Sequence, residues 1–273
     1  MRALSPRARS SWLLLLLLLA LPVLAQDERH IAELSRRFPD FSLSVKQKPF
    51  VVLGDLPQPE LEQYVDGTIS WAVRHLKRLY FAKDPPPLDV WLFQDEASYT
   101  RHVKQLTGSE PGTPYGFYSP THNGLFMNIH TGGGTLVHEL VHPFIHANFP
   151  RCPAWFNEGL ASLYEQCGEK DGVIWGYPNW RLPGLQEAIR KSSLPSFATL
   201  TAMSPDDFYG QDRGTNYAQA RYLCLYLQEK GLLKTFYYRF ANTKKDPTGW
   251  KNLQALLGDF QTNWEGWVLG LAL

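Results

Sequence analysis

The segment Thr135–Gly168 constrains the fold of this chain most, because it predicts two helices joined by an enforced turn. Apolar residues recur at helical spacing on both sides of Pro150 and Pro153. Proline lacks a backbone N–H, so it ends one helix and favours the first turn of the next. We therefore predict helices over residues 135–148 and 153–166, with the second folded back beside the first.

Two histidines of the first predicted helix are four residues apart, in the pattern His138-Glu139-Leu-Val-His142. Residues i and i+4 share one face of a helix, so both imidazoles can reach a single ion. Glu139 is turned by about 100° from His138 and can approach a water on that ion without binding the ion itself. The pattern predicts zinc bound by His138 and His142, with Glu139 as general base. The alternative is a helix whose histidines make ordinary polar contacts.

A catalytic zinc needs a third protein ligand and leaves its fourth position to water. His146 is two turns from His138, a rise of about 12 Å, so the three histidines cannot share one ion. Glu158 lies in the second predicted helix, which returns it beside His142. We predict Glu158 as the third ligand and His146 as a bystander. The alternative for Glu158 is a solvated helical carboxylate.

Other polar residues of the second helix are assigned by their spacing from Glu158. Asn157 and Ser162 can reach the ligand region and are candidates to orient the histidine rings. Glu165 is two turns beyond Glu158, and we predict it on the surface.

The motifs resemble the gluzincin metallopeptidases, in particular the bacterial exported proteins called peptidase MA-like. The similar segments are His138–His142, Trp155–Ala161, Gly116–Tyr118 with Leu125–Ile129, and the helix around Asn216-Tyr217, within about Tyr115 to Phe240. The resemblance implies a thermolysin-like fold in which Leu125–Ile129 is the edge strand that pairs with an extended peptide. It also implies that Tyr217 stabilises the oxyanion formed when a zinc-activated water attacks a carbonyl and Glu139 accepts its proton.

The rest of the chain predicts an α+β fold with two unlike parts. Residues 26–130 contain strands at 41–45, 50–53 and 88–93, a helix capped by Asp95 that runs to about Leu106, and a hairpin at Asn123-Gly124. Together these predict a mixed sheet with helices and an edge-strand hairpin. Residues 131–273 are predicted to be almost wholly helical and to carry the histidines and Glu158. The zinc cleft is expected between the two parts.

Residues 1–25 have the pattern of a secretory signal peptide: three arginines, an apolar run over Trp12–Leu21 and small residues up to Ala25. Removing them takes three of the 27 Lys and Arg and none of the 26 Asp and Glu, so the net charge becomes −2. That charge argues against a nucleic-acid partner. We predict an exported protein, secreted or periplasmic, without a membrane span after cleavage.

Three cysteines in an exported chain allow one disulfide. Cys152 and Cys167 flank the second predicted helix, and a straight helix would separate their Cα atoms by about 20 Å, too far for a bridge. Any disulfide would therefore join Cys224 to one of the other two.

Together these features predict a zinc-dependent, endopeptidase-like hydrolase that acts on a peptide or protein outside the cytoplasm. Two alternatives belong to other classes. One is a noncatalytic zinc-containing module of the same fold that binds peptide or cell wall, and the other is a metal-free interaction protein. Glu139 favours the enzyme, because metal binding alone gives no reason for a carboxylate there.

Overall fold

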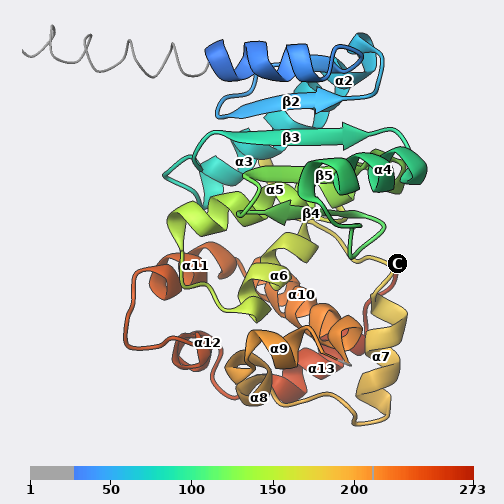
Figure 1. Cartoon of the computed structure of the whole chain (residues 1–273). Helices are drawn as coiled ribbons and strands as arrows, with labels where there is room; N and C mark the ends of the chain where they lie inside the picture. The colour runs from blue at the N-terminus through green and yellow to red at the C-terminus, as the bar shows by residue number, and fades with distance from the viewer. Residues whose placement is uncertain (1–27, 211) are drawn as a thin grey trace, which may run out of the picture.

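The computed structural model describes residues 28–210 and 212–273, so the signal peptide predicted for residues 1–25 lies outside the described residues. Figure 1 shows an upper part built on a sheet and a lower part made mainly of helices. The chain is therefore a mixed α and β protein, as predicted. In the described ranges, every helix is too short or too polar to cross a membrane.

The sheet of the upper part is mixed and has five strands in the order β1-β2-β3-β5-β4. Its central strands β2, β3 and β5 are parallel, while β1 and β4 run antiparallel to their neighbours. The strands are β1 Ser42–Ser44, β2 Phe50–Gly54, β3 Leu88–Phe93, β4 Gly116–Ser119 and β5 Gly124–Asn128. The predicted strands and the hairpin at Asn123-Gly124 are confirmed.

The prediction that Leu125–Ile129 forms the edge strand is wrong. β5 pairs with β3 on one side and with β4 on the other, so β4 is the edge. The carbonyl of Tyr115 accepts from the N–H of Asn128, which places the backbone groups of Tyr115 and Phe117 toward β5. The backbone groups of Gly116 and Tyr118 therefore point away from the sheet, toward the region below it.

Side-chain alternation along the strands divides the upper core between the two faces of the sheet. One face, with Val90 and Leu125, packs against helices α2 (Gln58–Tyr64), α3 (Ser70–Leu79) and α5 (Gly133–Asn148). A π-helical segment, Val65–Ile69, joins α2 to α3. The other face, with Trp91 and Phe126, packs against the helix over residues 28–37 and α4 (Glu96–Thr107). The carboxylate of Asp95 accepts from the N–H of Ser98 and caps α4 as predicted.

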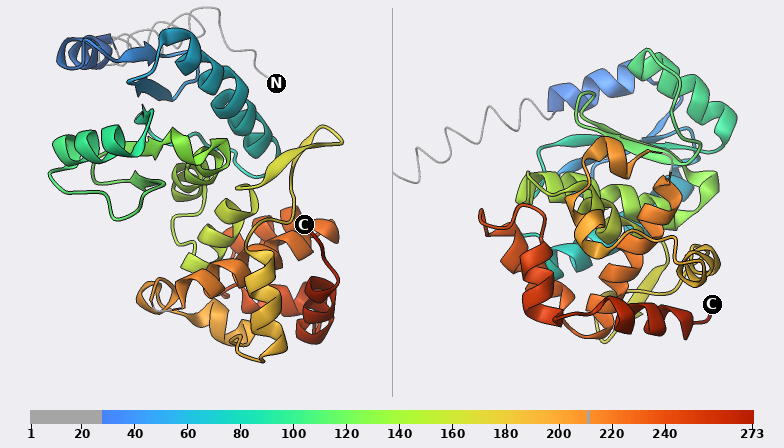
Figure 2. Two further views of the ribbon diagram at one scale, coloured as in Figure 1. Left: turned by 90° about the vertical axis from the view of Figure 1, so that its right-hand side faces the viewer. Right: turned by 90° about the horizontal axis from the view of Figure 1, so that it is seen from below.

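The lower part is less purely helical than predicted. Its helices are α6 Ala154–Leu163, α7 Leu182–Arg190, α8 Phe197–Ala202, α9 Pro205–Phe208, α10 Arg213–Glu229, α11 Leu233–Ala241, α12 Trp250–Leu257 and α13 Gln261–Leu269. Between α6 and α7 the chain forms a hairpin of β6 (Cys167–Lys170) and β7 (Val173–Gly176), which the sequence analysis missed. Its turn residues Asp171 and Gly172 both have positive φ angles, the conformation that a tight hairpin needs. Figure 2 shows this hairpin projecting between the two parts.

Helices α6 and α10 are in close contact at Gly159, where a Cβ atom would lie 2.9 Å from the carbonyl oxygen of Ala220 and 3.1 Å from the sulfur of Cys224. Cys152, Cys167 and Cys224 are all free thiols, so the predicted option of a disulfide to Cys224 is not realised. Packing, rather than a covalent link, therefore holds α6 on α10.

The variant Gly159→Ala tests this contact. We expect it to lower the free energy of unfolding by about 1–3 kcal/mol, because the backbone of α10 must move to admit the methyl group. Urea denaturation followed by circular dichroism measures the change. Gly266→Ala in α13 is the matched control: no atom lies within 4 Å of its added Cβ, and higher helix propensity should stabilise it by up to about 1 kcal/mol. Equal effects of the two variants would contradict the packing argument.

Candidate metal centre

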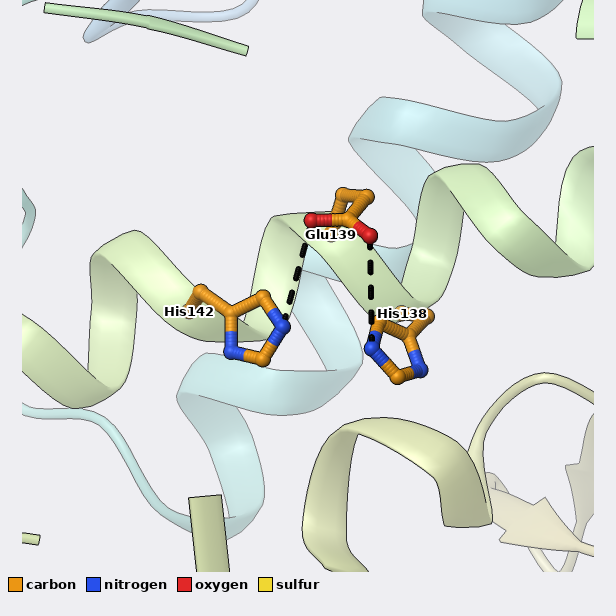
Figure 3. A group of neighbouring side chains, drawn as sticks. All are labelled: His138, Glu139 and His142. Carbon is orange, nitrogen blue, oxygen red and sulfur yellow. Dashed lines mark ion pairs between the residues drawn. The ribbon is translucent and has the colours of Figure 1, made fainter. Parts of the chain in front are cut away.

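Three side chains of α5 form a candidate metal-binding group below the sheet. Figure 3 shows His138, Glu139 and His142 pointing toward one another from adjacent turns of the helix. Their ligand atoms lie within 4.8 Å of one another. Nε2 of His138 is 4.0 Å from Oε1 of Glu139, and Nε2 of His142 is 3.9 Å from Oε2 of Glu139. The i and i+4 spacing thus brings both imidazoles to one point, as predicted.

Glu158 reaches the same point from α6. Its Oε2 lies 3.3 Å from Nε2 of His138 and 3.9 Å from Nε2 of His142. Two ligands of one tetrahedral zinc are about 3.3 to 3.4 Å apart, so this spacing suits a shared ion. Oε2 of Glu158 is also buried and has no hydrogen-bond partner among the described residues. His138, His142 and Glu158 are therefore placed to hold a metal ion.

Glu139 differs from Glu158 in its contacts. Its Oε2 accepts a hydrogen bond of 3.0 Å from the backbone N–H of Tyr118, at the outer edge of β4. This contact holds the Glu139 carboxylate close to both imidazoles. Glu158 is nevertheless nearer to Nε2 of His138 than Glu139 is. The two carboxylates are thus held by different elements, which suits different roles.

His146 is not part of the metal-binding group. Its Nδ1 lies 3.4 Å from the hydroxyl of Tyr118, and it lines the cleft beyond His142. The predicted bystander role agrees with this position.

The second nitrogen of each candidate histidine ligand also has a partner. Oδ1 of Asn157 lies 3.0 Å from Nδ1 of His142, so the expectation for Asn157 is met. Nδ1 of His138 lies 3.2 Å from Oε1 of Glu165. The prediction that Glu165 lies on the surface is therefore wrong: its side chain is only 8% exposed. Ser162, the other candidate, is buried, and its hydroxyl has no hydrogen-bond partner in the described part of the chain.

Glu165 turns inward because α6 ends at Leu163 rather than continuing to residue 166. The guanidinium of Arg221 donates through Nε to the carbonyl of Ser162 at 2.8 Å and through Nη2 to the carbonyl of Leu163 at 3.3 Å. These bonds satisfy the end of α6, so the chain can leave the helix there. Arg181 then binds Glu165 through two hydrogen bonds, of 2.8 and 3.1 Å. No sequence pattern indicated this arrangement, because Arg181 and Arg221 are distant in sequence.

The buried charges of the centre stabilise one another. Burial opposes protonation of His138, but Glu158 and Glu165 outweigh it and raise its pKa to about 10. Burial opposes ionisation of Glu158, yet the charges of His142 and His138 hold its pKa at about 2. Burial likewise opposes ionisation of Glu165, whereas hydrogen bonds from His138 and Arg181 hold its pKa at about 2. A metal ion that binds here must therefore displace a proton from His138.

Two tyrosines of the lower part lie beside Glu158. Tyr209 donates a hydrogen bond of 2.8 Å from its hydroxyl to Oε1 of Glu158. No sequence pattern predicted this contact. Tyr217 lines the same cleft, and its ring packs against the guanidinium of Arg181, 5.5 Å from the ring centroid. Burial and the negative charge of Glu158 raise the pKa of both phenols far above its ordinary value. Both hydroxyls therefore remain hydrogen-bond donors.

The group lies in a cleft of about 840 Å³ between the upper and lower parts of the molecule. β4 and the loop before it form one wall, with Tyr115 and Gly116. Segments of the lower part, including Trp180 and Tyr217, form the other. The cleft is large enough for several residues of an extended peptide.

A comparison with protein-family models finds no match to this chain, and no curated protein matches it significantly. The resemblance of its motifs to gluzincins therefore stays a prediction.

Replacement of Glu165 tests how the His138 ring is held. We expect Glu165→Gln to weaken metal affinity about 10- to 100-fold, because the ring loses a charged acceptor. Competition of the purified protein with a chelator, using Zn²⁺ as the probe, measures the affinity. Glu187→Gln is the matched control, since Glu187 is an exposed residue of α7 that pairs with Lys191 just after the end of that helix. Unchanged affinity in Glu165→Gln would show that the ring is held without this carboxylate.

Proposed function

We propose that this protein is a zinc-dependent, endopeptidase-like hydrolase of peptide bonds. The proposal rests on the way His138 and His142 from α5 lie beside Glu158 from α6. The carboxylate of Glu139 lies 3.9–4.0 Å from the Nε2 atoms of both histidines. Two imidazoles and one carboxylate form a three-ligand set typical of catalytic zinc. A site used only for structure would more commonly be closed by a fourth protein ligand.

In this proposal, His138, His142 and Glu158 would hold the zinc, which would supply Lewis-acid chemistry to a water molecule and to the substrate carbonyl. Glu139 accepts the proton of the attacking water and then passes it to the leaving amine nitrogen. The N–H of Tyr118 orients Glu139 for both transfers. Tyr217 donates its hydroxyl to the oxyanion, and Tyr209 holds Glu158 in its ligand position.

The substrate of the proposed reaction is an extended peptide that adds to the edge of the sheet. The strand that receives it is β4, rather than the Leu125–Ile129 segment expected from the sequence. The backbone of Gly116 and the carbonyl of Tyr118 face away from β5 and border the cleft, where they can pair with a peptide backbone. Strand pairing of this kind recognises the backbone of the peptide rather than its side chains, so it suits an enzyme that cleaves unfolded protein.

The wider assignments belong to the same proposal. A mixed sheet whose edge strand β4 contacts α5, with α6 packed on α5 and carrying Glu158, supports a thermolysin-like, gluzincin fold. The arginines and apolar run of residues 1–25 support action outside the cytoplasm. A peptide or protein is the partner that the cleft suits, and the charge of the chain does not favour nucleic acid.

The central prediction compares the wild type with Glu139→Gln and His142→Ala. We expect wild type and Glu139→Gln to bind one zinc per chain and His142→Ala to bind far less. Hydrolysis of an unfolded protein should fall at least about 10²-fold in Glu139→Gln, because the proton acceptor is lost. Metal analysis and a fluorogenic protein substrate measure the two properties, with Glu187→Gln as control.

Equal hydrolysis by wild type and Glu139→Gln would refute the proposal that the protein is an enzyme. Zinc without hydrolysis would favour the noncatalytic binding module, and a wild type without zinc would leave a metal-free interaction protein.

The two tyrosines give a separate prediction. We expect Tyr217→Phe to lower kcat about 10²- to 10³-fold with zinc affinity unchanged, because it removes the proposed oxyanion donor. Tyr209→Phe should instead weaken zinc affinity, since Glu158 loses a hydrogen bond. Steady-state kinetics and chelator competition on both variants separate the effects. The reverse pattern would make Tyr209 the oxyanion donor.

A further inference from the structure

One cation of the cleft has no counter-charge. Arg213 lines the cleft at the start of α10, where its side chain is exposed. It forms no ion pair or side-chain hydrogen bond in the described part of the chain, although Asp206, Asp207 and Asp212 lie close in sequence. The other arginine of the cleft, Arg181, is bound to Glu165. Arg213 is thus available to a ligand.

Arg213 follows the N-cap residue Asp212, whose side chain forms no cap hydrogen bond with the helix. It lies in the first turn of a 17-residue helix that has no acidic residue in that turn. Helix N-termini carry partial positive charge and favour anions, so a cation is disfavoured there. Glu139 and Glu158 together balance a divalent ion at the metal centre, and Arg181 balances Glu165. Among the described residues that line the cleft, Arg213 is then the arginine that no carboxylate pairs with.

Arg213 is also placed to meet a substrate near the bond that is cut. It lies four residues before Tyr217, so the two side chains share one face of α10 about 6 Å apart along the helix axis. Tyr217 is beside Glu158 in the cleft. An extended peptide advances about 3.3 Å per residue, so a peptide that ran along this face of α10 would meet Arg213 about two residues from a carbonyl beside Tyr217. The neighbouring Gly214 also lines the cleft, and no other atom lies within 4 Å of where its Cβ would be, which leaves space for a side chain of the peptide.

We propose that Arg213 is a specificity-determining residue that binds a carboxylate of the substrate within about three residues of the cleaved bond. This inference rests on the proposed function for the cleavage step, but the binding step is independent of it. The carboxylate comes from an acidic side chain or from the carboxyl terminus of the peptide. Guanidinium binds either one through paired N–H groups.

The test uses zinc-loaded full-length protein and octapeptide pools in which one position is fixed as Glu, as Gln or as Lys, with both ends blocked. A second set of pools has a free carboxyl terminus. Binding is measured by calorimetry on Glu139→Gln, which removes turnover, and cleavage by wild type is followed by mass spectrometry. Arg213→Gln and Arg213→Glu are then made in both backgrounds. Arg239→Gln is the matched control, because Arg239 is exposed on α11 outside the cleft.

We expect Glu pools to bind and be cut about three- to tenfold better than Gln pools, as for a partly exposed ion pair. The preference should vanish in Arg213→Gln, turn toward Lys pools in Arg213→Glu, persist in Arg239→Gln and shrink at about 1 M salt. A preference only for free carboxyl termini would identify the chain end as the carboxylate.

The remaining outcomes distinguish the carboxylate site at Arg213 from the proposed hydrolase activity. Equal binding of Glu, Gln and free-terminus pools would overturn the role of Arg213, even if wild type cleaves them all. A Glu preference that Arg213→Gln retains would overturn it as well. Binding preference without cleavage would refute the proposed hydrolase and leave the carboxylate site standing.

Discussion

The cleft depends on the burial of three carboxylates beside two histidines. A buried carboxylate without partners would cost several kcal/mol, so the surrounding chain must supply donors or cations. Each carboxylate obtains a different one: a backbone N–H of β4, a tyrosine hydroxyl or an arginine. His138 of the upper part then pairs with Glu158 and Glu165 of the lower part, and these two contacts tie the parts together. The carboxylate–donor pairs are Glu139 with Tyr118, Glu158 with Tyr209 and Glu165 with Arg181.

The same requirement explains the unusual details of α6. Arg221 is fully buried and pairs with no carboxylate of residues 28–210 or 212–273, and burial lowers its pKa to about 10. It nevertheless stops α6 at Leu163, which frees Glu165 to face His138. Gly134, in the first turn of α5, has no side chain where the carbonyl of Glu165 passes. The buried guanidinium of Arg221 and the missing side chain at Gly134 therefore both allow the Glu165 carboxylate to take its position.

Features governed by neighbours in sequence were predictable. The helix cap at Asp95, the hairpin at Asn123-Gly124 and the shared face of His138 and His142 follow from local backbone geometry, and all three are present. Features governed by distant partners were not. The hairpin signal at Asn123-Gly124 predicted a strand over Leu125–Ile129, but it could not show that β3 and β4 would occupy both of its sides.

The sequence by itself determined that two imidazoles face one point on α5 and that a proline turn returns Glu158 toward them, because chain stiffness over one or two helical turns fixes those relations. Only the tertiary structure decided that Glu165 is buried and that Tyr209 binds Glu158. It also placed the free edge on β4 and left Arg213 facing the cleft unpaired. The reason is physical: a buried charge pairs with a group that is close in space, and residues far apart along the chain become neighbours only when the chain folds.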